Sequence, residues 1–454
     1  MKFESRNPFN DKLLQKFNLL KDRELEEALQ KAEYAFAINR TSAIPVRTKR
    51  LLNLIRVLEE RKEVAAALMT EEMGKPIQQA IAEVDKCIQL CQFYMDSTAE
   101  FLKDQQVETD AIKSSIYYAP LGLILGIMPW NFPFWQVFRF AIPALMTGNA
   151  VLLKHAPNVP RCAAFIEDLF VEAAWPDHLF QNLYISNEQV ARVIEDDRIQ
   201  GVSFTGSLKT GSIIGALAGS NIKKCILELG GSDAFVVLAD ANLKEAAHVA
   251  IASRMLNNGQ SCIAAKRWIV DQVVAESFVS LVQEEISRLV VGDPKDPNTD
   301  VGPMARKDLA LELHRQMEDS ISQGARVLYG GGIRKSGTSM FEPTLLVDVE
   351  PGMPCFDEET FGPLATVIVA EDDQDAIMLA NQSKYGLGAS IWSTDRDRAN
   401  ILAKQLQCGT VTINGMVKSH VELPFGGIRN SGFGRELGQF GLMEFVNIKT
   451  ILSY

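Results

Sequence analysis

The alternation of short apolar runs with amphipathic segments constrains the fold of this 454-residue chain more than any other feature. The runs LILGI, AVLLK, NLYIS, QGVSFTG, KKCILELGG and AFVVLA alternate with segments of helical spacing. A second block from Ala241 to about Asn430 repeats the pattern with RWIVDQVV, ATVIVAE, GASIWS and GTVTIN. Such alternation is typical of parallel sheets. The sequence therefore predicts an α/β protein with two open, mostly parallel sheet domains and a cleft between them.

The two ends of the chain carry different signals. Apolar residues from Asp22 to about Gln92 have helical spacing, and Gly74 and Pro76 separate one helix from another that begins near Ile77. The segments IKSSIYY (112–118) and NIKTILSY at the C-terminus are β-prone and fit neither block. Because unpaired strands expose a sticky edge, we expect them to pair with each other and with another subunit.

The composition indicates which cellular compartment and which classes of binding partner to expect. The net charge of −11 disfavours nucleic acid and anionic membranes as partners. The seven cysteines follow no disulfide framework, and the N-terminus lacks a signal-peptide pattern, so we expect a reducing cytoplasm. The longest apolar stretch (121–135) is interrupted by glycines and prolines, which argues against a membrane span. The five histidines form no HExxH and no CxxC occurs, so no metal site is predicted.

Three short motifs offer chemistry. Cys262, in NNGQSCIAAKR, precedes small residues that suit a loop or strand entering a helix, whose first N–H groups would lower the thiol pKa. Glu228 ends the apolar strand of LELGG, where open α/β sheets collect ligands, and a partly buried carboxylate there can act as a general base. Asn131 lies between two prolines in PWNFP, on a rigid turn from which its amide can stabilise an oxyanion.

Each of these residues also has a structural interpretation. A lone cysteine is more often a buried packing residue, a glutamate can cap a turn, and an asparagine between prolines can be an ordinary turn residue. A fourth motif, SFTGSLKTG, places Ser207 and the amides near Gly206 at a helix start that suits a pyrophosphate, although it lacks the GxGxxG spacing. The motifs gain weight only in combination.

In combination they resemble a known family. WNFP, FTGS, LELGG, GQSC, EETFGP (358–363) and PFGG followed by SGFGRE (424–436) occur in the order and approximate spacing of the aldehyde dehydrogenase superfamily. The resemblance covers nearly the whole chain. Within the superfamily the sequence is most similar to the NAD(P)-dependent succinate semialdehyde dehydrogenases, in particular to the bacterial type that carries KHAPNV after WNFP.

The resemblance implies a covalent mechanism. Cys262 attacks the aldehyde as a thiolate, Asn131 and the Cys262 N–H hold the oxyanion, and Glu228 activates the water that hydrolyses the thioester. Lys154 would contact the adenosine ribose, Ser207 the pyrophosphate and Glu359 the nicotinamide ribose, with Phe361 packed against the ring. The full set of implied cofactor contacts is Trp130, Lys154, Pro157, Gly206, Ser207, Leu229, Glu359 and Phe361.

The resemblance also implies a division of the chain. Residues 1–100 and 121–229 would form a Rossmann-like cofactor-binding domain, and residues 230–430 the catalytic domain. Residues 101–120 and 431–454 would form a small β oligomerisation flap of a homodimer or homotetramer. The expected partner is a small-molecule aldehyde.

Substrate choice is predicted from three residues. Arg139 stands where succinate semialdehyde enzymes hold the distal carboxylate, and a guanidinium pairs with a carboxylate through two hydrogen bonds. The alternative is an arginine in a structural ion pair. A second arginine of some family members is replaced here by Leu256, so Ser419 or His420 would assist Arg139. Other chain lengths near four carbons, such as glutarate semialdehyde, remain open.

The cofactor and the reaction class each have alternatives. Pro157 stands where NAD-preferring relatives often place a glutamate, and His155 and Lys209 would favour a 2′-phosphate, so we predict NAD with NADP tolerated. A CoA-acylating dehydrogenase is disfavoured because Glu228 is present. A cofactor-independent thiol hydrolase would have no need for Lys154, FTGS or Glu359. A non-catalytic protein would not need Cys262, Glu228 and Asn131 together.

Overall fold

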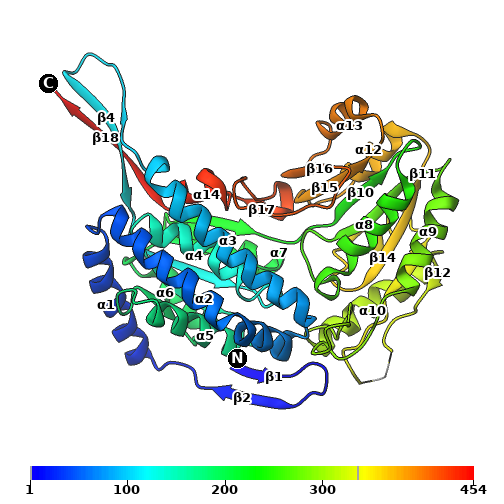
Figure 1. Ribbon diagram of the computed structural model, residues 1–454, viewed down its shortest axis with the longest axis horizontal. Coiled ribbons are helices and arrows are strands. Elements are labelled where there is room, and N and C mark those ends of the chain that lie inside the picture. Colours follow the sequence, from blue (N-terminus) through cyan, green and yellow to red (C-terminus); the bar gives the residue numbers. More distant parts are fainter. Residues whose placement is uncertain (1–2, 335–336) are drawn as a thin grey trace.

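The computed structural model describes residues 3–334 and 337–454, which form four sheets (Figure 1). The first sheet has six strands, and neighbours pair in parallel except for β17, which is antiparallel to β9. Its strands, in spatial order, are β17 (Gly432–Phe433), β9 (Lys224–Glu228), β8 (Ile199–Thr205), β5 (Leu123–Met128), β6 (Ala150–His155) and β7 (Phe180–Asn182). The run NLYIS was expected as a strand, but β7 ends at Asn182, so only the first residue of this run pairs with β6.

Helices before and between these strands pack around the first sheet. They are α1 (Asp22–Asn39), α2 (Ile44–Met73), α3 (Ile77–Phe101), α4 (Trp135–Met146), α5 (Pro160–Glu172), α6 (Asn187–Glu195) and α7 (Leu208–Ser220). The predicted helical region and the break at Gly74 and Pro76 are confirmed, since α2 ends at Met73 and α3 begins at Ile77. Helix α4 packs tightly on β5, where a Cβ at Gly126 would lie 1.9 Å from the Phe140 ring.

The second sheet has seven strands and is parallel apart from β12, which is antiparallel to β13. Its strands, in spatial order, are β12 (Arg326–Tyr329), β13 (Thr344–Val347), β14 (Leu364–Ala370), β11 (Ala265–Asp271), β10 (Asp233–Val237), β15 (Gly388–Trp392) and β16 (Thr410–Ile413). The run AFVVLA was grouped with the first block, but as β10 it belongs to this second sheet. Two mostly parallel sheets in one α/β chain confirm the predicted fold class.

The helices of the second sheet follow its strands along the chain. They are α8 (Leu243–Met255), α9 (Ala275–Ser287), α10 (Lys307–Ser322), α11 (Pro354–Asp357), α12 (Asp373–Asn381) and α13 (Arg396–Ala403), with the short 3-10 turns η1 (Leu256–Gly259) and η2 (Arg429–Ser431). In Figure 1 the helices α8, α9, α10, α12 and α13 lie in the lobe opposite the first sheet. None of the helices in the described part of the chain is long and apolar enough to cross a membrane.

The remaining strands lie outside the two large sheets. Strands β1 (Phe3–Arg6) and β2 (Leu13–Phe17) form a hairpin, and β18 (Val446–Ser453), β4 (Lys113–Pro120) and β3 (Gln105–Gln106) form an antiparallel sheet. The predicted pairing of the two β-prone segments with each other is confirmed along the whole of β18. Within the segment 431–454, however, Gly432–Phe433 pairs with β9, and α14 (Gly438–Met443) lies between that strand and β18. Figure 1 shows β4 and β18 projecting from the body as an arm.

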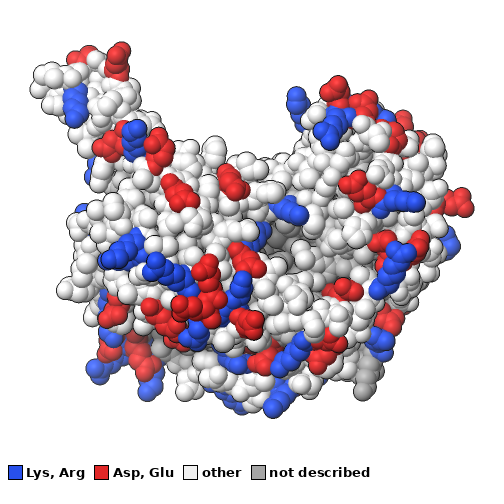
Figure 2. All heavy atoms as spheres, viewed as in Figure 1, with Lys and Arg blue, Asp and Glu red and all other residues white. Residues whose placement is uncertain are grey.

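The topology brings two sheet edges together. Strands β5, β8 and β9 are parallel neighbours, so their carboxyl ends share one edge of the first sheet. Residues 229–232 then carry the chain to β10, whose amino end shares an edge with that of β11. The carboxyl edge of one sheet therefore lies next to the amino edge of the other. Figure 2 shows acidic and basic side chains interspersed over both lobes, with a deep notch between the arm and the second lobe.

A buried ion pair anchors the start of α4. The carboxylate of Glu83, on α3, pairs with the Lys75 ammonium, and both side chains are at most 2% exposed. Its other oxygen accepts hydrogen bonds from the N–H groups of Phe134 and Trp135 at 2.9 Å. The Lys75 ammonium also lies 4.0 Å from the centre of the Phe132 ring. The pair thereby fixes the WNFP turn against α3.

This anchor predicts a large stability effect. Glu83→Gln leaves the Lys75 ammonium buried without a counter-charge, which should lower the free energy of unfolding by about 3–5 kcal/mol. The matched control is Glu27→Gln, which removes the same charge from the exposed Arg23–Glu27 pair and should cost less than about 1 kcal/mol. Denaturant unfolding followed by circular dichroism measures both, and equal shifts would contradict the anchoring role.

Candidate active site

The predicted nucleophile lies in a loop at the amino edge of the second sheet. Helix α8 ends at Met255, η1 follows, and β11 begins three residues after Cys262. The prediction that Cys262 precedes a helix is therefore wrong, because the small residues after it lead into a strand. Within residues 256–271 the thiol is preceded by a 3-10 turn and followed by a strand, so the expected helix start that would lower its pKa is not there.

The loop before Cys262 has an unusual backbone. Asn257, Asn258 and Gly259 have φ values of 56°, 58° and 72°, in the left-handed region. A Cβ at Gly259 would lie 2.2 Å from the Gly362 carbonyl oxygen, so only glycine fits. A conformation of this kind persists only when its surroundings hold it, and such strain is common at functional sites.

Side-chain hydrogen bonds stabilise this backbone conformation. The Asn257 amide donates to the Asn131 carbonyl at 2.7 Å, and the Asn258 amide donates to the Gly74 carbonyl at 2.8 Å and the Pro303 carbonyl at 2.9 Å. The amide of Asn131 in turn donates to the Gln260 carbonyl at 3.1 Å. These bonds tie the Cys262 loop to the WNFP turn. An amide nitrogen carries two N–H groups, so Asn131 keeps one for another acceptor.

The thiol of Cys262 is strongly perturbed. Burial raises its pKa to about 12, although the cations of Lys266 and Arg139 oppose the rise and the carboxylate of Glu228 adds to it. The expected lowering of this pKa is therefore not found in the ligand-free protein. Glu228 therefore lies close enough to Cys262 to act on its thiol electrostatically.

The predicted base belongs to a buried group of three charges. Glu228 Oε2 lies 4.0 Å from Arg139 Nη2, and Arg139 Nε forms an ion pair with Glu436. All three side chains are only 2% exposed. Burial raises the pKa of Glu228 well above its usual value, against the opposing effect of Arg139, and burial likewise raises the pKa of Glu436. Arg139 is thus in the structural ion pair that was the alternative interpretation, and it also borders the cavity described below.

A buried lysine that no motif argument singled out joins three parts of the site. The Lys266 ammonium donates to the Gly231 carbonyl at 2.6 Å, to the Cys262 carbonyl at 2.8 Å and to Glu359 Oε1 at 3.1 Å. Glu359 Oε1 also accepts the Gly231 N–H at 3.0 Å. The LELGG, GQSC and EETFGP motifs are therefore held by one ammonium group.

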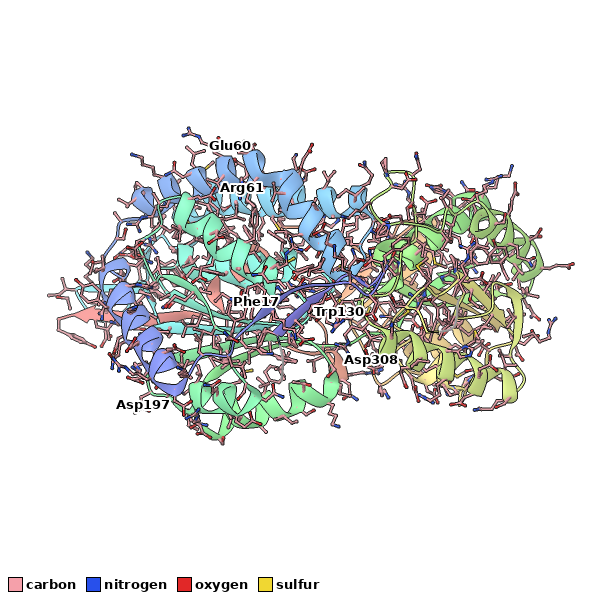
Figure 3. All side chains as sticks on the ribbon, turned by 90° about the horizontal axis from the view of Figure 1, so that it is seen from below. Phe17, Glu60, Arg61, Trp130, Asp197 and Asp308 are labelled. Carbon is pink, nitrogen blue, oxygen red and sulfur yellow. The ribbon has the colours of Figure 1, made fainter. Side chains whose placement is uncertain are left out.

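The predicted cofactor residues fall into two groups. Trp130 and Phe361 meet edge to face, with ring centres 5.8 Å apart, and Glu359 lies beside them through Lys266. Figure 3 shows Trp130 where the two lobes of the molecule meet. This first group therefore lies close to Cys262, where a nicotinamide is expected.

The second group lies along the carboxyl edge of the first sheet. Ser207 is exposed and caps α7, accepting the Thr210 N–H at 3.4 Å. The Gly206 N–H donates to the Glu228 carbonyl, so it is not free to bind a pyrophosphate as predicted. Leu229 is buried, and its N–H donates to the Ser431 carbonyl. The remaining residues of this group lie on and after β6.

The residues on and after β6 bear on cofactor choice. Burial lowers the pKa of Lys154 to about 8, and Pro157 borders a separate cavity of about 380 Å³. His155 was expected to favour a 2′-phosphate, but it is fully buried and its Nε2 pairs with the Pro133 carbonyl, so it has no exposed edge. Lys209 is exposed on α7.

A cavity of about 660 Å³ opens beside Cys262. It lies between α3, α4, the Cys262 loop and the segment 416–422, and it brings together all three predicted substrate residues, Arg139, Ser419 and His420. Ser419 is buried, whereas His420 is exposed at the rim. Within residues 3–334 and 337–454, no group of three or more histidine, cysteine, aspartate or glutamate side chains is arranged to hold a metal ion.

Sequence reasoning missed several residues of the site. Glu436 ends the SGFGRE motif and Lys266 follows Cys262 in the GQSC run, so both lay within quoted motifs but carried no role. Asn257 and Asn258 stand directly before Gly259, where consecutive residues suited to positive φ were a signal of a tight turn. Lys86, which borders the cavity from α3, has no motif around it.

Comparison with known proteins places the chain in a family. The family model described as "Aldehyde dehydrogenase family" matches residues 1–451 of this chain. The chain belongs to the aldehyde dehydrogenase family. It is 47% identical over 445 residues to a probable NADP-dependent succinate-semialdehyde dehydrogenase of Synechocystis sp., covering 98% of each chain. It is 45% identical to the NAD(P)-dependent succinate semialdehyde dehydrogenase Sad of Escherichia coli, covering 94% of this chain and 93% of that one.

Solved structures agree with the family assignment. Succinic semialdehyde dehydrogenase from Streptococcus pyogenes, in complex with NADP⁺, superposes with a TM-score of 0.97 at 34% identity, covering 99% of each chain. Betaine aldehyde dehydrogenase from Staphylococcus aureus, in complex with NAD⁺, superposes with a TM-score of 0.95 at 27% identity, covering 100% of this chain and 91% of that one. The fold is thus shared by enzymes of different substrates, and the family makes this chain an NAD(P)-dependent oxidoreductase.

The raised thiol pKa predicts a specific pH dependence. Only the thiolate reacts with iodoacetamide, and below the pKa of about 12 its fraction grows about tenfold for each pH unit. In the ligand-free protein the alkylation rate of Cys262 should therefore rise without a plateau between about pH 7 and pH 10. Cys262→Ala provides the background from the other six cysteines. A plateau near pH 8 would contradict this description of the site.

Proposed function

We propose that this enzyme oxidises succinate semialdehyde to succinate with NAD(P) through a thioester on Cys262. The observation that carries the proposal is that Cys262 lines a cavity that also contains cationic side chains, while Glu228 acts electrostatically on its thiol and the Asn131 amide bonds to the Gln260 carbonyl in the same loop. The relatives described above are named for this substrate. They are dehydrogenases, which favours a dehydrogenase over the cofactor-independent thiol hydrolase.

In the proposed reaction Cys262 loses its proton and its sulfur adds to the aldehyde carbon. The resulting oxyanion accepts hydrogen bonds from the Cys262 N–H and from the free N–H of the Asn131 amide. Loss of hydride from the adduct leaves a thioester. Glu228 then removes a proton from water, whose oxygen attacks the thioester carbon. The bond between carbon and sulfur breaks, which releases the acid and returns Cys262 as the thiolate. Because burial raises its pKa, Glu228 is a stronger base than an exposed glutamate.

The residues present fit a dinucleotide. A bound nicotinamide supplies the hydride acceptor of this chemistry. Helix α7 begins at the carboxyl end of β8 with an exposed serine cap, a common arrangement for binding a pyrophosphate. We propose that Ser207 contacts the phosphates, Lys154 the adenosine ribose and Glu359 the nicotinamide ribose. The bound dinucleotide would also be lined by Trp130, Phe361, Leu229 and Pro157.

The choice between NAD and NADP depends on the side chains proposed to lie near the adenosine ribose. Pro157 carries no carboxylate to repel a 2′-phosphate, and Lys209 is an exposed cation on the helix that follows β8. We therefore propose that NADP is accepted as well as NAD. The relatives named above use NADP or both cofactors.

We further propose a homodimer or homotetramer that assembles through the arm. Strand β18 exposes Ile448, Ile451 and Leu452, which are 61%, 49% and 48% exposed. An exposed apolar edge strand favours pairing with another chain.

We assign residues 1–100 and 121–229 to the cofactor domain and residues 230–430 to the catalytic domain. A cytoplasmic location fits the seven cysteines, all of them free thiols.

Substrate preference tests the proposed function. The wild-type enzyme should have a kcat/KM for succinate semialdehyde at least about tenfold above that for butanal, because a charge-assisted contact to the carboxylate contributes binding that butanal lacks. Steady-state assays with NAD and with NADP measure this ratio. An equal kcat/KM for the two aldehydes would remove the narrow assignment and leave the family assignment intact.

The role of Glu228 has its own test. Glu228→Gln should still release one equivalent of reduced cofactor per active site in a rapid burst, because hydride transfer precedes hydrolysis. The steady-state rate should then fall by about 100-fold or more, since the thioester lacks its base. Stopped-flow absorbance at the reduced nicotinamide band measures both phases. Full steady-state turnover would refute the assigned base.

A further inference from the structure

The cavity beside Cys262 contains several charged side chains, and three of them are already held in buried ion pairs. Lys75 pairs with Glu83 in the interior. Arg139 pairs with Glu436 and lies near Glu228, so its single positive charge faces two carboxylates. A substrate carboxylate that approached Arg139 would compete with both of them.

Lys86 differs from these cations. Its side chain projects from α3 and is partly buried, and no carboxylate oxygen within the described residues lies within 4.0 Å of its ammonium group. Burial and repulsion by Arg139 lower its pKa to about 8, although Glu83 opposes the shift. Glu83 is itself the ion-pair partner of Lys75, so Lys86 has no carboxylate of its own in the part of the chain that the structure describes. Lys418 also borders the cavity, but it is exposed to solvent.

Two contacts fix the position of the Lys86 ammonium. It donates a hydrogen bond to Ser419 Oγ at 2.6 Å and lies 4.3 Å from the centre of a Trp135 ring. An ammonium group has three N–H donors, and Ser419 uses one of them. Donors therefore remain for an anion in the cavity. The serine hydroxyl, acting as acceptor to Lys86, also has its own proton available for the same anion.

From this arrangement we propose that Lys86, oriented by Ser419 and Trp135, is the direct ligand of the substrate's distal carboxylate and selects acid aldehydes over uncharged ones. The proposal rests on the proposed function and deepens it. It assigns to Arg139 a different part, which is to hold Glu228 and Glu436 in place as their counter-charge. It also supplies the second positive group that Leu256 leaves missing.

The test compares lysine variants by their specificity ratio, which is kcat/KM for succinate semialdehyde divided by that for butanal. Lys86→Met keeps the length of the side chain and removes the ammonium, so the ratio should fall about 10- to 100-fold, mainly through KM for the acid aldehyde. Lys86→Arg restores a cation and should recover part of the ratio. Lys418→Met is the matched control, removing a charge from the same cavity at its exposed rim, and should change the ratio less than about twofold.

A binding measurement makes the test independent of turnover. Succinate should slow the alkylation of Cys262 by iodoacetamide in the wild type and in Lys418→Met but not in Lys86→Met, and butanol should not discriminate among the three. Retention of both the wild-type ratio and succinate protection in Lys86→Met would overturn the role of Lys86. If the wild-type enzyme had no preference for the acid aldehyde, the proposed function would be wrong. Succinate protection lost in Lys86→Met would then still support Lys86 as a carboxylate ligand, and protection retained in that variant would overturn it.

Discussion

The architecture of the site depends on one buried ammonium group. Lys266 is 1% exposed, and its three hydrogen bonds reach the LELGG segment, the Cys262 carbonyl and Glu359. A buried cation is costly unless all of its donors are satisfied, so the three segments must converge for the protein to fold. Because the first of these segments leaves β9 and the second enters β11, the same contact holds the edges of the two large sheets together.

Around this junction the protein places carboxylates and cations in a nearly water-free region. Arg139 has Glu436 and Glu228 as partners, which keeps the proposed base beside the thiol and leaves little positive charge for a substrate. Lys86 borders the cavity next to this group and has a serine and an indole as partners. An anionic aldehyde entering an acidic protein therefore meets an ammonium group without an ion-pair partner among the described residues and the reactive sulfur in the same cavity.

Periodicity was sufficient to predict the class of fold and the pairing of β4 with β18, because both follow from local apolar patterns. It placed AFVVLA with the wrong sheet, since the apolar pattern of a strand does not encode which neighbours it pairs with. The prediction of a helix after Cys262 was wrong because small residues suit a helix start and a strand entry equally well. The motifs located Cys262, Glu228 and Asn131, whose neighbourhood in space depends on contacts such as Asn257 to Asn131. The partners Glu436 and Lys86 lay beyond local reasoning, because each meets its contact across the fold.

In the proposed mechanism oxidation proceeds through a thioester on Cys262, which water activated by Glu228 hydrolyses. The most direct measurement is the mass of intact Glu228→Gln enzyme after acid quenching of a reaction with succinate semialdehyde and NADP, followed by peptide mapping. The account predicts one added succinyl group on the peptide that contains Cys262, and only when the oxidised cofactor is present. Reduced cofactor formed with an unmodified Cys262, or an acyl group on any other residue, would contradict it.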